Sequence, residues 1–210
     1  RSPTKPVFVD CNAISPNTTL FIANKMREAG MSMLNVGIIG PPPGGDSATR
    51  FYASGTNIEL IRFIDGDGIK FVPLGDKITA ASEIKMCYAA LTKGMMTLHV
   101  SVLVVAELLG ISSEIQRELE DSQQYHWDIM NKRVSKYACD AGRWAGEMDQ
   151  ISETYNTVGM TSKLHKGAAD VFRLLDPNRN IKSSDKALAL FSVSIYSLIG
   201  LLSATIPAPA

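Results

Sequence analysis

Prolines divide this chain into two stretches of different character. No proline lies between Pro73 and Pro177, and apolar residues recur there at intervals of three and four positions. Proline breaks a helix because its ring clashes with the preceding turn and because it has no amide hydrogen to donate. The stretch from Asp76 onward is therefore predicted to be nearly all helical. The residues before it alternate short apolar runs with turn signals, which predicts an α/β sheet flanked by helices.

The α/β stretch carries signals for two helices and four strands. Ser15 followed by Pro16 predicts an N-cap and the proline favoured in a first turn, and Gly30 is placed to end that helix. A second, short helix is expected at Asn57–Ile64. The strands are expected at Val7–Val9, Met33–Ile39, Arg50–Ala53 and Ile69–Val72.

The helical stretch opens with an unusually long apolar pattern over Lys77–Leu109. At 1.5 Å per residue such a helix would span roughly 50 Å, which is enough to link two domains. Gly110 is expected to end it, and Ser113 with Gln116 to form a capping box at the start of the next helix. Further helices are predicted at Gln123–Ala138, Arg143–Thr157 and Lys163–Leu175.

Charge and metal-ligand spacing exclude some classes of function. Lysine plus arginine equal aspartate plus glutamate at 21 each, without a basic stripe, so nucleic acid is not expected as a partner. The three cysteines are far apart and lack the spacing of a zinc site or a disulfide framework, and the three histidines also lack metal-ligand spacing. We therefore expect no metal site and a cytoplasmic location.

The segment 187–206 contains no charged residue and is long enough to cross a bilayer. It is also rich in serine, which lowers its hydrophobicity. A packed terminal helix, a subunit interface and a membrane anchor all stay open as interpretations of this segment.

Several segments, in the same order along the chain, resemble the 6-phosphogluconate dehydrogenase-like, or β-hydroxyacid dehydrogenase, superfamily. Asp10-Cys11-Asn12 with the following Pro16 resembles the turn and proline-started helix near the end of that family's dinucleotide-binding domain. The run GIIGPPPGG from Gly37 resembles its substrate loop, and EIKMCYAALTKG from Glu83 resembles the start of its long interdomain helix. The resemblance covers about residues 7–175.

This resemblance implies a fold, a reaction and a set of site residues. The fold would be a partial Rossmann-like α/β domain over residues 1–75, then an all-α domain over 76–182 joined by a long interdomain helix, with an apolar tail at 183–210. The reaction would be NAD- or NADP-dependent hydride transfer to or from a small hydroxy acid, carbonyl or imine. Lys85 would be its acid/base, and a homodimer would form through the helical domain. The binding residues implied are Asn12 and Pro16 for the cofactor, and Gly37, Ile39, Gly40, Pro41 and Tyr88 for the substrate.

The chain departs from the family pattern at three places. The sequence contains no GxGxxG phosphate-binding loop, the position four residues after Lys85 is Ala89, and Ile39 stands where the substrate loop often has serine. The alternative function is accordingly a non-catalytic dimerisation or binding module, with membrane association through its tail as a further option. Lys85 would then be a solvated helix charge, and Asn12 part of an Asx-type turn.

Overall fold

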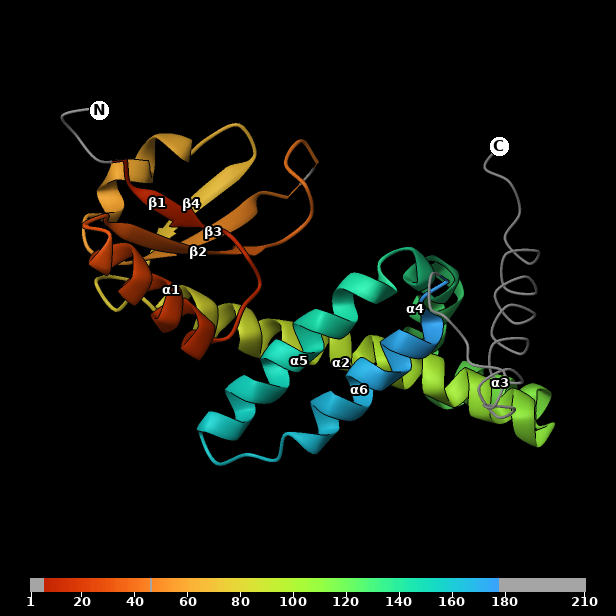
Figure 1. Cartoon of the computed structure of the whole chain (residues 1–210). Coiled ribbons are helices and arrows are strands. Elements are labelled where there is room, and N and C mark those ends of the chain that lie inside the picture. The colour runs from red at the N-terminus through yellow and green to blue at the C-terminus, as the bar shows by residue number, and fades with distance from the viewer. Residues whose placement is uncertain (1–5, 46, 178–210) are drawn as a thin grey trace. The chain divides into compact units, whose positions relative to one another are not determined.

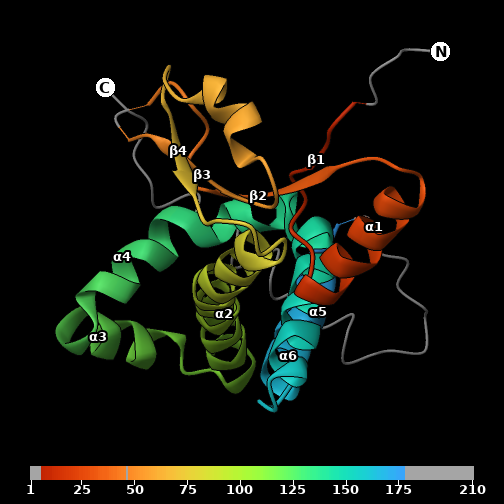
Figure 2. The same ribbon diagram turned by 90° about the vertical axis from the view of Figure 1, so that its left-hand side faces the viewer.

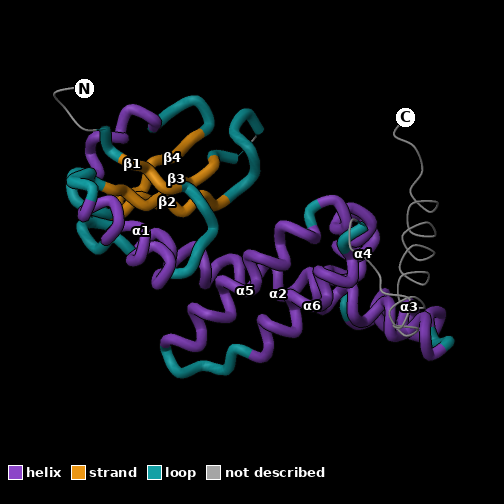
Figure 3. The backbone as a smooth tube through the Cα atoms, in the orientation of Figure 1, coloured by secondary structure: helices purple, strands orange, loops and turns teal. Residues whose placement is uncertain are grey.

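The computed structural model describes residues 6–45 and 47–177, so the apolar segment at 187–206 and the proposed part at 183–210 lie outside the described residues. The chain forms two compact units. The first comprises the described residues up to Ala90 together with Gln150–Ser162, and the second comprises Leu91–Asp149 and the described residues after Ser162. Within the described residues the first unit combines strands with helices and the second contains helices only (Figure 3).

The first unit is built on a four-stranded mixed sheet with the strand order β1-β2-β3-β4. β1 pairs with β2 in parallel, β2 with β3 antiparallel, and β3 with β4 in parallel. The strands are β1 (Phe8–Asp10), β2 (Met33–Ile39), β3 (Thr49–Ser54) and β4 (Ile69–Pro73). The four strands predicted from the sequence are confirmed to within two residues at their ends.

The two faces of β2 carry different side chains because successive residues of a strand point to opposite sides. Leu34 and Val36 join an apolar cluster with Phe71 and with Ile58 and Ile61 of a 3-10 helix, η1 (Ile58–Ile64). η1 lies on the opposite face of the sheet from α1 (Pro16–Glu28) (Figures 1 and 2). The other face of β2 carries Asn35 and Gly37, which contact the first turns of α2 (Ala80–Leu109).

α1 forms as the sequence predicts. The Ser15 side chain accepts a hydrogen bond from the Thr18 amide at 3.1 Å, and Pro16 occupies the first helical position. Gly30 follows the helix with a φ of +68°, a left-handed conformation that glycine adopts without steric cost. Local sequence signals are therefore sufficient to set both ends of this helix.

α2 is 30 residues long and belongs to both units, its first turns to the first unit and the rest to the second. Within the described residues it alone is long and apolar enough to cross a membrane by length and composition, and half of its most apolar 18-residue window is buried. The long helix predicted from Lys77 is confirmed, with its first turn at Ala80.

The remaining helices are α3 (Ser112–Ser122), α4 (Gln124–Arg133), the 3-10 helix η2 (Val134–Cys139), α5 (Ala141–Thr157) and α6 (Lys163–Leu175). The predicted capping box is wrong, because α3 begins at Ser112 and thus places Ser113 inside the first turn, while no side chain caps Ile111. The single helix expected over Gln123–Ala138 is two elements, since its last turns tighten into 3-10 geometry.

The second unit has an apolar core in which aromatic rings pack edge to face. The Trp144 ring lies 5.8 Å from that of Tyr137 and 5.3 Å from that of Phe172. A largely buried ion pair joins α2 to α5, with Lys93 Nζ 2.7 Å from a carboxylate oxygen of Glu147. The largest buried residues of this unit include Val100, Val104, Trp127, Met130, Val134, Met148, Phe172 and Leu175.

Gly37 sets how closely β2 and α2 approach. A Cβ atom at this position would lie 2.5 Å from the carbonyl oxygen of Ala81 and 3.2 Å from Cβ of Lys85. Both obstacles belong to a hydrogen-bonded helix, so they have little freedom to move aside.

Gly37→Ala is therefore expected to destabilise the protein by about 1–3 kcal/mol, because the strand and the helix must separate. The matched control is Gly94→Ala in α2, where an added Cβ meets open space. That change should raise the free energy of unfolding by up to about 1 kcal/mol through helix propensity. Chemical denaturation of both variants measures the difference, and equal effects at the two glycines would contradict this account of the contact.

Candidate functional site

The carboxyl ends of β1 and β2 lie at one edge of the sheet. The two strands run in parallel, with Asp10 in register with Asn35. Asn12 therefore follows β1 at the edge where Gly37 and Ile39 complete β2. The carboxyl ends of parallel strands are where α/β folds usually bind ligands. The register thus gathers the predicted cofactor-side and substrate-side residues at one edge.

Lys85 reaches this edge from the second turn of α2. Its ammonium Nζ donates a hydrogen bond to the carbonyl oxygen of Ile38 at 2.5 Å, and the side chain is half-buried. The short reach is possible because Gly37 leaves room for the helix to lie directly on the strand. An ammonium held against a strand carbonyl is oriented and partly shielded from water, as a proton-transferring lysine needs to be.

A polar layer between β2 and α2 holds the helix in position. The Asn35 amide nitrogen donates to the carbonyl oxygen of Ile78 at 3.0 Å and to the Ser82 hydroxyl at 2.7 Å. The Ser82 hydroxyl also lies 2.6 Å from that of Thr19 in α1. Asn35, Ser82 and Thr19 are all buried, so these hydrogen bonds replace some of those that water would make, while Asn35 Oδ1 has no partner among the described residues.

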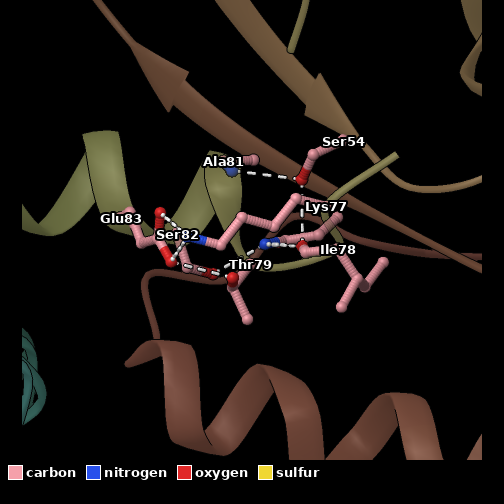
Figure 4. A network of polar contacts seen from close by, with 8 residues as sticks. Ser54, Lys77, Ile78, Thr79, Ala81, Ser82 and Glu83 are labelled. Atoms are coloured by element: carbon pink, nitrogen blue, oxygen red, sulfur yellow. Dashed lines mark hydrogen bonds and ion pairs between the residues drawn. The ribbon is translucent and has the colours of Figure 1, made fainter. Parts of the chain in front are cut away.

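β3 contributes a second contact to the same layer, shown in Figure 4. The Ser54 hydroxyl donates to the carbonyl oxygen of Ile78 at 2.9 Å and accepts from the Ala81 amide at 3.1 Å. Ala81 lies in the first turn of α2, where backbone amides have no partner within the helix. Ser54 therefore acts as a cap supplied by the sheet.

Side chains near the start of α2 add an outer cap. The Thr79 hydroxyl donates to Glu83 at 2.8 Å, and Lys77 forms an ion pair with the same carboxylate at 2.7 Å (Figure 4). Hydrogen bonds from Lys77 and Thr79 lower the pKa of Glu83 against the opposing effect of its burial. A carboxylate in the first turn also interacts favourably with the helix dipole. The amino end of α2 is thus fixed from both sides.

Asp10 and Asn12 form an Asx-type turn after β1. Asp10 Oδ1 accepts from the backbone amide of Asn12 at 3.0 Å and from its side-chain nitrogen at 2.5 Å. Asp10 is buried, and its other oxygen, Oδ2, has no hydrogen-bond partner among the described residues. Burial, and secondarily the charge of Asp10, raise the pKa of the neighbouring Cys11 thiol, which therefore stays protonated and weakly nucleophilic.

The start of α1, including Pro16, is joined to the end of α5. The Ser15 amide donates to Gln150 Oε1 at 2.8 Å, and the Ser15 hydroxyl donates to Glu153 at 3.0 Å. The Thr18 hydroxyl donates to the same Gln150 oxygen at 3.0 Å. These contacts hold the amino end of α1 beside the turn that carries Asn12.

The loop after β2 begins at Gly40, whose φ of +125° favours glycine. Thr49 of β3 donates a hydrogen bond to the Pro41 carbonyl oxygen, which secures the start of the proline run. Ile39 is buried, whereas Gly40 and Pro41 are exposed. Tyr88 is 45% exposed on α2, one turn after Lys85. Backbone groups, rather than side chains, are what this loop presents.

The structure therefore places Lys85, Gly37, Ile39 and Gly40 close together, with Asn12 on the neighbouring strand end. Sequence reasoning missed the polar layer of Asn35, Ser54, Ser82 and Thr19. A usable signal was present, because Asn35 is a polar residue within the otherwise apolar strand MLNVGII. No cluster of three or more metal-ligating side chains occurs among the described residues.

Comparison with known proteins places this geometry in a wider context. Residues 106–175 match a family model described as a domain of unknown function, DUF1932. The chain is 27% identical over 131 residues, or 62% of its length, to an uncharacterized 28.5 kDa protein of Methanothermus fervidus. It matches 50% of that relative, so the chain spans about half the length of the curated relative it resembles.

Two solved structures share the fold. A conserved hypothetical protein from Sinorhizobium meliloti has a TM-score of 0.65 and 18% identity, covering 90% of this chain and 66% of that one. A 3-hydroxyisobutyrate dehydrogenase from Mycobacterium tuberculosis, in a structure with L-serine, has a TM-score of 0.58 and 17% identity, covering 91% and 69%. The chain therefore shares its fold with a 3-hydroxyisobutyrate dehydrogenase, as the resemblance in the sequence predicts. The α/β part followed by a helical part is confirmed.

Asn35→Asp tests the polar layer with almost no change in shape. The substitution replaces a buried amide donor by an acceptor that faces the Ile78 carbonyl, so unfolding free energy should fall by about 1–3 kcal/mol. Asn24→Asp is the control, because Asn24 is exposed and already accepts from Arg27. Thermal denaturation compares the two, and a change at position 35 no larger than at position 24 would contradict a structural role for this amide.

Proposed function

We propose that this chain provides the substrate-handling part of an NAD(P)-dependent oxidoreductase that acts on a small hydroxy acid, carbonyl or imine. The observation that carries the proposal is the position of Lys85 Nζ at the carbonyl oxygen of Ile38, at the carboxyl edge of the β1–β2 pair. Asn12 and the Gly37–Pro41 segment lie at the same edge. The fold shared with a 3-hydroxyisobutyrate dehydrogenase supports the assignment.

Lys85 would act as the general acid and base. As the carbonyl carbon of the substrate takes up hydride, the Lys85 ammonium gives a proton to the carbonyl oxygen and becomes a neutral amine. In the opposite direction the neutral amine removes the hydroxyl proton while the carbon loses hydride. An imine nitrogen would receive the proton in the same way. The Ile38 carbonyl orients the amino group of Lys85 for both directions of the reaction.

The described residues fit the nicotinamide end of a dinucleotide better than its phosphates. A nicotinamide cofactor supplies or accepts the hydride. Asn12 is exposed at the strand end where it would contact the ribose or carboxamide, and Pro16 starts the helix that follows. Asp10 Oδ2, beside this turn, is buried and has no hydrogen-bond partner among the described residues. The 210 residues contain no GxGxxG loop for the pyrophosphate.

The loop composition suggests how the substrate would be held. Ile39 occupies the position at which the resembled family often has a serine, so this loop would bind the substrate chiefly through backbone groups at Gly40 and Pro41. Tyr88, one turn after Lys85 on α2, would also contact the substrate. This arrangement favours a small substrate over one whose binding requires several charged side chains of the protein.

Lys85→Met tests the catalytic role. Removing a positioned general acid lowers kcat/KM by about 10²–10⁴-fold, measured as nicotinamide absorbance change with small 3-hydroxy acids, L-serine among them. Lys70→Met, at an exposed lysine of β4, is the control and should leave the rate unchanged. Equal losses in the two variants would reject Lys85 as the acid/base, and absence of NADH and NADPH binding or turnover in the unaltered chain would reject the proposed function for it.

We further propose that two copies associate through the second unit. α2 carries exposed apolar residues that recur at heptad-like intervals and therefore lie on one side of the helix. They are Leu91, Leu98, Val102, Val105 and Leu109, which we call the α2 stripe. A second α2 stripe would be complementary to the first in a two-fold dimer.

Val105→Glu tests this association by placing a charge within the α2 stripe. The unaltered chain is expected to sediment as a dimer at micromolar concentration, and the variant as a monomer with unchanged helical circular dichroism, because an unpaired buried carboxylate opposes the contact. Leu60→Glu, at an exposed leucine of η1, provides the same chemical change outside the stripe and should stay dimeric. A monomeric unaltered chain would overturn the dimer.

A further inference from the structure

The second unit contains a partly open pocket of about 450 Å³, and none of its lining residues belongs to the edge of the sheet that carries Lys85. It is formed by α2, α4 and η2, and its lining is mainly apolar, including Leu91, Met95 and Ile129. This volume and this composition are typical of sites for small organic molecules. The pocket lies within a single unit, so its walls are set by local helix packing.

Two histidines give the pocket its polar wall. His99 Nε2 lies 3.1 Å from His126 Nδ1, and both residues line the pocket. His99 is only 4% exposed, and its remaining ring nitrogen, Nδ1, has no hydrogen-bond partner among the described residues. Burial, and then the neighbouring His126, lower the pKa of His99, so its ring is neutral at neutral pH. A buried polar nitrogen without a partner is unusual in folded proteins and marks a position where a ligand group would be stabilised.

Arg133 gives the pocket a positive charge. Arg133 is exposed, and no acidic residue of the described part of the chain lines the pocket or forms an ion pair with it. A guanidinium binds a carboxylate through two parallel hydrogen bonds. A phosphate would require more cationic groups or a run of backbone amides, which helices α2 and α4 do not present in their middle turns.

We propose that this pocket binds a small monocarboxylic acid with an apolar or aromatic body. The carboxylate pairs with Arg133, the body lies against Leu91, Met95 and Ile129, and a polar group on the body hydrogen-bonds to His99 Nδ1. The proposal does not depend on the oxidoreductase activity, because none of these residues belongs to the edge that carries Lys85.

Calorimetric titration of the whole chain, without nicotinamide, tests the site with two probes that share one body. 4-Phenylbutyrate should bind at least about tenfold more tightly than 4-phenylbutan-1-ol, because only the acid forms charge-assisted hydrogen bonds. Arg133→Gln should remove that preference while leaving the alcohol's affinity unchanged. Lys132→Gln is the matched control, since it removes the same charge from the preceding residue of α4, which does not line the pocket.

Ile129→Trp adds a test of location, because the larger side chain fills the pocket and should abolish binding of both probes. Circular dichroism checks that this variant and Arg133→Gln are folded. Equal affinity for the acid and the alcohol, absence of binding to the unaltered chain, or equal effects of the changes at 132 and 133 would each overturn the proposal.

Discussion

β2 and α2 approach each other closely at Gly37, and the candidate site depends on this contact. A side chain there would meet the Ala81 carbonyl and the base of Lys85. Without one, the first turns of α2 lie against β2, and the Lys85 ammonium reaches the Ile38 carbonyl. Gly37 therefore contributes by having no side chain, which leaves space for α2. Its backbone is in an ordinary strand conformation, paired with Tyr52 of β3.

Close approach alone would leave polar backbone groups in the first turn of α2 and in the turn before it buried and unpaired. Asn35 and Ser54 resolve this problem from two different strands, since both bind the Ile78 carbonyl and Ser54 also binds the Ala81 amide. Thr19 extends the same layer to α1 through Ser82. Hydrogen bonds are directional, whereas apolar packing tolerates sliding. A polar layer is thus suited to holding the amino end of α2, and with it Lys85, in one register on the sheet.

α2 makes different contacts along its length, and the residues on its sides differ accordingly. In the first unit the Ser82 hydroxyl binds Asn35 of β2, and apolar residues such as Met86 and Ala89 are buried beside it in the sequence. In the second unit Lys93 pairs with Glu147, Val100 and Val104 are buried, and the α2 stripe is exposed. Residues 91–99 also line one wall of the pocket with the histidine pair. A helix whose apolar residues occupy more than one side has a weak amphipathic pattern, so the sequence showed its length more clearly than its contacts.

Local signals in the sequence determined the elements. Ser15 with Pro16 and the strand MLNVGII are signals of a few residues, and they correctly predicted α1 and β2. The absence of proline from 74 to 176 correctly predicted the run of helices. Local signals failed at Ser113, because α3 begins two residues earlier than a capping box with Ser113 as N-cap requires. The family resemblance predicted the fold and pointed to Lys85 without showing what lies near it.

Tertiary structure decided which residues meet. Asn35 and Ser82 are 47 positions apart and His99 and His126 are 27 apart, and no periodic pattern relates the members of either pair. Their contacts depend on strand register and helix packing, which bring distant residues together after the local elements have formed. For the same reason the sequence identified Lys85 as a candidate acid/base, while only the packing at Gly37 placed its ammonium at the edge of the sheet.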